Sequence, residues 1–274
     1  MKIRLYFSLF FSSLAIFSCL NMVRAEDPVP KPVTEKIELF NGRNLDNWYV
    51  FLKGHQVGED PDNVFTVEDG MIHISGNGFG CITSKEAFCD YQIIVEFKWG
   101  EKTWQSRVDR ARDCGLLVHS VGEDGAYGGI WKCSIEANII EGGMGDFIVV
   151  GDNTDNFSLT ANVAPQKSKF GSYIYQKDGE PVTINSGRID WYGRDPDWED
   201  KTNFRGRNDL TNPHGEWNTL KIICKGDTLD VYLNGTLVNQ AYNVKPAGGQ
   251  IQLQAELAEI FFRRVTLLPL DAEE

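Results

Sequence analysis

The feature that most constrains this chain is a succession of short apolar–polar alternations separated by turn residues. Residues 63–75 give a strand, an Asp-Gly turn and a second strand, which is typical of a β-hairpin. Residues 91–99 alternate again with period two, and the same pattern returns in residues 217–224, 228–238 and 249–270. No long stretch carries a helical period. The pattern predicts a β-sandwich or β-barrel.

We expect one all-β domain over residues 37–272, because sandwiches of this length commonly form a single domain. Residues 152–186 are polar, contain Gly and Pro and lack strong alternation. This segment is therefore predicted to be a long loop, in which a short hairpin could form near Tyr173 to Gln176. Long loops in compact domains are often functional.

The first 25 residues resemble an export signal. A basic start is followed by an apolar run, Leu5–Phe17, and the segment ends in Val23-Arg24-Ala25. The run is too short and too rich in Ser for a membrane span, so we expect none in the mature chain. Removal of residues 1–25 would leave an extended, Pro-rich linker at 26–36 and an exported protein, periplasmic or secreted. Lipoprotein processing at Cys19 is the alternative.

The net charge argues against nucleic acid as a ligand, and the spacing of the cysteines argues against zinc. The chain has 27 Lys and Arg against 39 Asp and Glu, a formal charge of −12, so no nucleic-acid partner is expected. None of the six Cys has the spacing of a zinc site. Cys81 and Cys89 could form a disulfide in an oxidising compartment, or could be small buried residues on strands.

Two neighbouring segments carry polar residues suited to acid–base chemistry. In a continuous strand, Asp113 and His119 would share one face while Leu116 and Val118 point into the core. On this segment alone, the pattern favours a surface histidine at the end of a strand.

The second segment contains Glu136 and Asn138 on the face opposite an apolar row. A carboxylate is costly to bury without a partner, so Glu136 is expected to face a groove, a cation or a ligand. Glu141 and Asp146 flank the turn that follows. Together with His119, these carboxylates could form a divalent-cation site, an acid–base pair or a solvated acidic turn.

Two further patterns suit saccharide recognition. Residues 188–198 interleave aromatic rings with charges, including Arg194, as in a sugar-binding surface or in a loop anchored by its two Trp. Gln252, Gln254 and Glu256 lie on one strand face, which suits hydroxyl groups but is also typical of any solvated sheet face.

Short motifs follow one another in a fixed order along the chain: Phe40-Asn41-Gly42 to Trp48, Val67-Glu68-Asp69-Gly70, Asp113-Cys114-Gly115 with His119, Ser134-Ile135-Glu136 to Gly145-Asp146, Glu216-Trp217-Asn218, Asn234-Gly235 and Gly249 to Gln254. In this order they resemble the 3-keto-disaccharide hydrolase family, also described as 3-keto-glucoside-1,2-lyase/2-hydroxyglucal hydratase. The similarity covers residues 37 to 270. Cys114, Asn138 and Leu257 stand where this family usually has Ser, Gln and Gly.

The resemblance implies a concanavalin-A-like jelly roll whose concave sheet carries the site. It also implies a saccharide substrate in which C3 has been oxidised to a ketone. The ketone acidifies the C2 proton, so that a base can remove it and the oxygen at C1 can leave by β-elimination. Water then adds to the enone. The reaction needs a base, an acid and an electrophile for the enolate oxygen.

Mapped onto the family motifs, His119 and Glu136 are the acid–base candidates, and Asp113 would orient His119. Glu141 and Asp146 would hold one divalent cation or support the turn. The candidate substrate contacts are Lys53, Trp131, Lys132, Asn138, Arg194 and Gln254. Two other functions remain open, a non-catalytic glycan-binding module of the same fold and a structural or adhesion domain.

Overall fold

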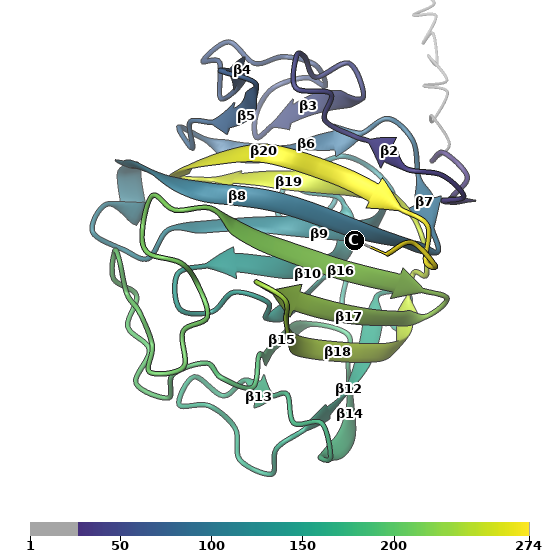
Figure 1. Ribbon diagram of the computed structural model, residues 1–274, viewed down its shortest axis with the longest axis vertical. Coiled ribbons are helices and arrows are strands. Elements are labelled where there is room, and N and C mark those ends of the chain that lie inside the picture. The colour runs from purple at the N-terminus through teal and green to yellow at the C-terminus, as the bar shows by residue number, and fades with distance from the viewer. Residues whose placement is uncertain (1–26, 274) are drawn as a thin grey trace, which may run out of the picture.

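The computed structural model describes residues 27–273, which form two large β-sheets packed face to face (Figure 1). Within these residues the only helical element is a single 3-10 turn, η1 (Gln105–Arg107). The prediction of an all-β jelly-roll sandwich is confirmed. No helix in this part of the chain has the length and apolar character needed to cross a membrane.

The eight-stranded sheet has the order β13-β15-β11-β10-β9-β19-β6-β3. Its central strands come from distant parts of the sequence, since β9 pairs with both β10 and β19. The strands of this sheet are β3 (Trp48–Leu52), β6 (Phe79–Ser84), β9 (Asp113–Val121), β10 (Cys133–Ile140), β11 (Phe147–Val150), β13 (Tyr173–Ile174), β15 (Gly187–Asp190) and β19 (Gln250–Glu256).

The ten-stranded sheet has the order β14-β12-β18-β17-β16-β8-β20-β5-β4, and β2 also pairs with β20. Its strands are β2 (Ile37–Glu38), β4 (Phe65–Glu68), β5 (Met71–Ile74), β8 (Tyr91–Thr103), β12 (Ser158–Val163), β14 (Glu180–Ile184), β16 (Asn218–Lys225), β17 (Thr228–Leu233), β18 (Thr236–Lys245) and β20 (Ala258–Leu268). A separate parallel pair joins β1 (Lys31–Pro32) to β7 (Phe88–Cys89), so part of the expected linker lies against the domain.

The hydrophobic core lies between the two sheets. Ile135, Ala137 and Ile139 of β10 point into it and are buried, as are Val95 and Phe97 of β8. This is the apolar row that the alternation predicts for β10. Because successive side chains of a strand point to opposite faces, Glu136 and Asn138 must lie on the face turned away from the core, here called the outer face.

The prediction of a long loop over residues 152–186 is wrong in part. Strands β12 and β14 within it pair with each other, and β12 also pairs with β18. They end the ten-stranded sheet, and β14, which is largely exposed, contains Pro181. Exposure and proline are typical of edge strands, and they weaken the alternation from which a strand is recognised.

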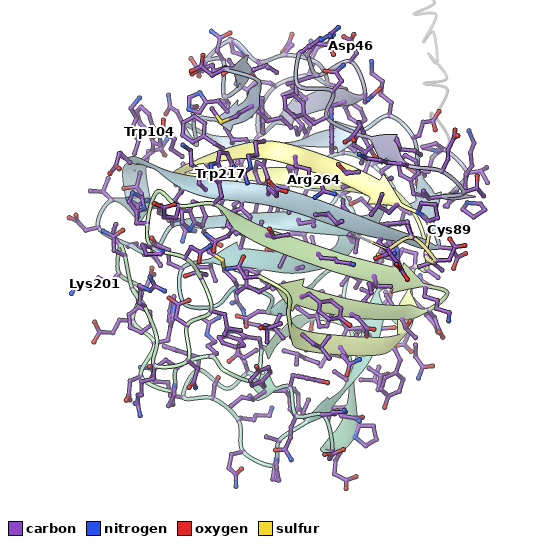
Figure 2. All side chains as sticks on the ribbon, viewed as in Figure 1. Asp46, Cys89, Trp104, Lys201, Trp217 and Arg264 are labelled. Atoms are coloured by element: carbon purple, nitrogen blue, oxygen red, sulfur yellow. The ribbon has the colours of Figure 1, made fainter. Side chains whose placement is uncertain are left out.

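Two loops meet at one end of the sandwich. The connection from β8 to β9 contains Trp104, and the long connection from β15 to β16 contains Lys201; Figure 2 shows both side chains at the same end of the molecule. Asp200 links the loops, because its carboxylate accepts hydrogen bonds from the Ala111 amide at 3.0 Å and from Arg110 Nε at 2.6 Å.

Candidate active site

Three carboxyl groups gather on the outer face of the eight-stranded sheet. Asp113, Glu136 and Glu256 come from the adjacent strands β9, β10 and β19. Asn138 Nδ2 donates to Glu136 Oε1 at 2.7 Å and to Asp113 Oδ1 at 3.4 Å, so these two carboxyls are neighbours. Arg107 Nη2 lies 3.1 Å from Asp113 Oδ2 and 3.3 Å from Glu256 Oε1. We call Asp113, Glu136 and Glu256 the acid cluster.

Two amides support the cluster from the same face. Asn138 and Gln254 both donate to Glu136, the latter from Nε2 to Oε2 at 3.3 Å. Their own carbonyl oxygens are buried and have no protein partner among the described residues. A buried polar atom without a partner is costly, so these oxygens are suited to accept hydrogen bonds from a ligand's hydroxyl groups.

Gly115 makes room for this arrangement. It lies on β9, and a Cβ at this position would collide with Gln254 Oε1 and stand only 2.7 Å from Glu136 Oε1. Because real Cβ atoms do not approach so closely, any larger residue would push the two side chains away from their present positions.

The acid cluster is little exposed, and burial governs its ionisation. Burial and the charge of Asp113 raise the pKa of Glu136 to about 8. Burial, followed by the charges of Asp113 and Glu136, raises the pKa of Glu256 well above its usual range. Burial also raises the pKa of Asp113, although Arg107 and Arg188 oppose the rise. Closely placed carboxyls cannot all ionise, so the cluster holds protons at neutral pH.

Arg188 on β15 is the second cation of the site. Its charge lowers the pKa of all three carboxyl groups of the acid cluster. Its side chain is 25% exposed, more than those of Arg107 (12%), Asp113 (10%) or Glu256 (18%). Arg188 is therefore the cation that a ligand entering this site could reach most easily.

Asp146 holds Arg188 in place. Its Oδ2 accepts from Arg188 Nη1 at 2.7 Å and from Arg194 Nη1, and its Oδ1 accepts from the Trp191 amide at 2.8 Å. The carboxylate is fully buried and engaged by two cations. Asp146 therefore orients Arg188 and does not fit the role of a metal ligand.

Glu141 is engaged in the same way. Its Oε1 accepts from Arg112 Nη1 at 2.8 Å, and its Oε2 accepts from the amides of Arg112 and Asn203 at 2.9 and 3.0 Å. Among residues 27–273, no three His, Cys, Asp or Glu side chains are grouped to hold a metal ion. Of the two roles expected for Glu141 and Asp146, support of the turn fits and metal binding does not.

His119 does not join the acid cluster. Its φ is 56°, and the pairing of β9 with β10 and β19 shifts register beside it, which marks a β-bulge. The bulge turns the ring into the core, where its centroid lies 6.0 Å from that of Tyr91. Nδ1 is 2.9 Å from the Pro246 carbonyl oxygen, and the residue is fully buried. The expectation that His119 acts with Glu136, oriented by Asp113, is wrong.

The other expected substrate contacts are divided. Asn138 and Gln254 donate to Glu136 of the acid cluster, and Arg194 donates to Asp146, which also binds Arg188. Trp131 and Lys132 precede β10 and lie elsewhere. Trp131 packs with a second small hydrophobic cluster and donates to the Gly80 carbonyl at 3.1 Å.

Lys132 is also buried, and its Nζ lies 2.6 Å from Gln250 Oε1 and 3.0 Å from Asp27 Oδ1. Lys53 is exposed and follows β3, the edge strand. These side chains therefore do not meet the acid cluster. Arg107, Arg188 and Glu256 belong to the site instead. Arg188 and Glu256 fall in the two sequence patterns suited to saccharide recognition, whereas nothing in the sequence pointed to Arg107.

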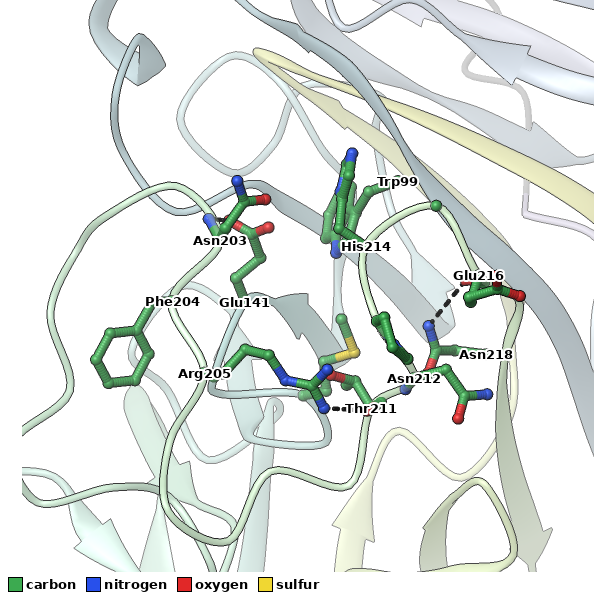
Figure 3. Close-up of a pocket in the computed structure, with 14 residues that line it drawn as sticks. Trp99, Glu141, Asn203, Phe204, Arg205, Thr211, Asn212, His214, Glu216 and Asn218 are labelled. Atoms are coloured by element: carbon green, nitrogen blue, oxygen red, sulfur yellow. Dashed lines mark hydrogen bonds between the residues drawn. The ribbon is translucent and has the colours of Figure 1, made fainter.

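A pocket lies under the long loop from β15 to β16 (Figure 3). Trp99, Glu141, Asn203 and His214 are among its lining residues. Its volume of about 40 Å³ has room for a few water molecules and not for a sugar ring. This pocket is therefore too small to be the saccharide site.

A two-sheet jelly roll with carboxyl and amide side chains on one outer face is suited to a carbohydrate-active β-sandwich protein. The chain belongs to the 3-keto-alpha-glucoside-1,2-lyase-like domain family, whose sequence pattern matches residues 35–268. The family expected from the motifs is confirmed.

Solved structures share the fold. A candidate glycosyl hydrolase from Parabacteroides distasonis ATCC 8503 superposes with a TM-score of 0.50 and 18% identity, covering 86% of this chain and 94% of that chain. A structure reported with endo-acting O-glycanases of the human gut microbiota gives a TM-score of 0.50 and 11% identity, covering 87% and 100%. At such identities the likeness concerns the fold alone. No curated protein matches this chain.

Proposed function

We propose that this protein cleaves 3-keto-glycosides by β-elimination followed by hydration, so that the glycosidic bond is hydrolysed overall. The observation that carries the proposal is Glu136, whose pKa is raised to about 8. At neutral pH such a group is mostly protonated, and its pKa lies close enough to neutral pH for it to give up its proton and regain it. An acid catalyst requires both properties. The family match supplies the substrate class.

The elimination uses three neighbouring groups. Asp113, paired with Arg107, is the base that takes the C2 proton, and the C–H electrons move into an enolate at C3. Arg188 donates hydrogen bonds to the developing enolate oxygen. When the enolate collapses, the C1–O bond breaks and Glu136 gives its proton to the departing oxygen. The products are the alcohol and a 3-keto-2-hydroxyglucal.

Hydration reverses the proton movements. Glu136, now ionised, takes a proton from water as the hydroxide adds to C1 of the enone, and Asp113 returns its proton to C2. Both side chains then regain their starting protonation states. The unpartnered oxygens of Asn138 and Gln254 would accept hydrogen bonds from sugar hydroxyls.

The test is release of the second sugar from an oxidised disaccharide, compared with the parent disaccharide and measured with and without divalent cations. We expect release from the 3-keto substrate only. The Glu136→Gln variant should lose activity by about 10²–10⁴-fold, while Glu180→Gln, an exposed change on β14, should retain it. If several 3-keto-glycosides remain uncleaved under both conditions, the proposal is wrong. Calorimetric binding without turnover would instead identify a glycan-binding module.

We also propose that the chain is exported, on the basis of residues 1–25, which lie outside the described part of the structure. Mass spectrometry of the protein purified from its native host should give an N-terminus at residue 26. An acylated Cys19 would show a lipoprotein, and retention of residues 1–25 would contradict export.

A further inference from the structure

The aromatic and charged segment 188–198 divides between two places. Arg188 and Arg194 donate to Asp146 and Trp191 is buried, but Tyr192 remains 49% exposed. The Tyr192 ring packs edge-on against Trp191, with centroids 5.3 Å apart and planes at 70°. A large exposed ring held by a buried neighbour is a preorganised contact surface, and the proposed reaction does not use it.

Tyr192 lines one of two depressions that flank residues 175–177. The first has a volume of about 420 Å³ and also contains Ile174 and Leu237. The second, of about 300 Å³, lies over β17 and β18. Tyr175 and Lys177 line both depressions. Volumes of this size suit one sugar ring each, unlike the smaller pocket in Figure 3.

Polar groups of the second depression are held in fixed positions. Tyr175 Oη donates to Gln240 Oε1 at 2.6 Å, and Gln240 Nε2 donates to Asp230 Oδ1 at 2.8 Å. Tyr242 Oη donates to Asn162 Oδ1 at 3.1 Å, and Asn162 Nδ2 donates to the Lys177 carbonyl, also at 3.1 Å. Amide and carboxylate groups that need no rearrangement bind hydroxyls at a low entropic cost.

We propose that these two depressions form a second saccharide-binding site, distinct from the acid cluster, for a neutral oligosaccharide of two or more rings. One ring packs on Tyr192, and the next meets Gln240 and Asp230. The site lies toward the outer face of the ten-stranded sheet, because the core-facing residues of β17, Leu229 and Val231, alternate with Asp230. Lys177 and Asp230 balance each other in charge, and the chain's formal charge of −12 opposes anionic polymers.

The role of such a site is to hold a glycan near the protein while the acid cluster acts. No bond is made or broken at the site itself. Affinity electrophoresis in gels containing hydroxyethyl cellulose, barley β-glucan or soluble starch tests it directly. We expect at least one polymer to retard the wild-type protein. Tyr192→Ala should weaken the retardation by about tenfold, or about 1.4 kcal/mol, and Tyr192→Phe should retain most of it.

Phe170→Ala is the matched control, because Phe170 is also an exposed ring, at 60%, but lines neither depression. Glu136→Gln should be retarded like the wild type, which separates this site from the catalytic proposal. The inference is overturned if none of the three polymers retards the wild type, if Tyr192→Ala behaves like Phe170→Ala, or if Glu136→Gln removes the retardation.

Discussion

At the scale of single residues, Gly115 shows how closely the acid cluster is fitted. It has no positive φ, so its backbone would accept a side chain, and the obstacle is the space taken by Glu136 and Gln254. The Gly115→Ala variant should fold, with a loss of about 1–3 kcal/mol of stability, and should lose most of its activity on a 3-keto disaccharide.

The control for this prediction is Cys114→Ser. Cys114 is adjacent on β9 but points into the core, and its Sγ donates to the backbone carbonyl oxygen of Gln254 at 3.2 Å, a bond that Ser can keep. Chemical denaturation and initial rates should be measured on both variants. Wild-type activity in Gly115→Ala would show that the positions of Glu136 and Gln254 do not matter.

His119 gives a pH dependence of stability at the same scale. Burial lowers the pKa of His119 to about 4, below the value of 6.5 for an exposed histidine. The unfolded chain therefore binds the proton more tightly, and the unfolding free energy falls as pH drops from 6.5 toward 4. The contribution approaches about 3 kcal/mol. Urea unfolding from pH 7 to 4.5 should show a smaller decline in His119→Leu than in the wild type.

The control is His55→Leu, because His55 is exposed and its replacement leaves the buried His119 in place. The unfolding free energy of this variant should fall with pH as steeply as that of the wild type. An equal decline in His119→Leu and in the wild type would show that His119 is not the group responsible.

At the scale of elements, the connection from β8 to β9 brings a cation to the acid cluster. Arg107 belongs to η1, and its charge opposes the rise that burial causes in the pKa of Asp113 and of Glu256. In Arg107→Met these pKa values should rise further. The acidic limb of the profile of kcat/KM against pH should therefore move to higher pH, because the base must be ionised.

Arg107→Lys keeps the charge, so its acidic limb should move less than that of Arg107→Met. Titration of the side-chain carboxyls by carbon-13 NMR gives the same information without a substrate. An unchanged acidic limb in Arg107→Met, together with unchanged carboxyl titrations, would contradict this role.

Sequence alternation predicts those parts of the site that follow regular strands. It correctly places Glu136 and Asn138 opposite the apolar row of β10, because the period of two holds along the whole strand. It fails at His119, where a β-bulge adds a residue and reverses the side chain; the register of the partner strands determines the bulge. The Arg107 contacts are set by how a loop folds over the sheet, which no local pattern encodes.

At the scale of the whole molecule, the first described residue of the N-terminal segment, Asp27, binds the eight-stranded sheet side of the sandwich at Lys132 and Gly122. Asp27 accepts from Lys132 Nζ at 3.0 Å and from the Gly122 amide at 2.5 Å. Because Lys132 is buried, removing this charge should destabilise the fold, and we expect Asp27→Asn to cost about 1–3 kcal/mol in urea unfolding. Glu35→Gln, an exposed change in the same segment, serves as the control. Equal stability of the two variants would show that Asp27 contributes little.

The five described cysteines, Cys81, Cys89, Cys114, Cys133 and Cys224, are unpaired, and all but Cys89 are buried. The alternative of a disulfide between Cys81 and Cys89 is therefore not realised, and burial raises the pKa of the Cys81 thiol to about 12. Folding of residues 27–273 thus needs no oxidant, so bacterial cytosol should yield correctly folded material. Within residues 27–273, a maleimide dye added under native conditions should modify one position, Cys89 on β7, and provide a fluorescent reporter without mutagenesis.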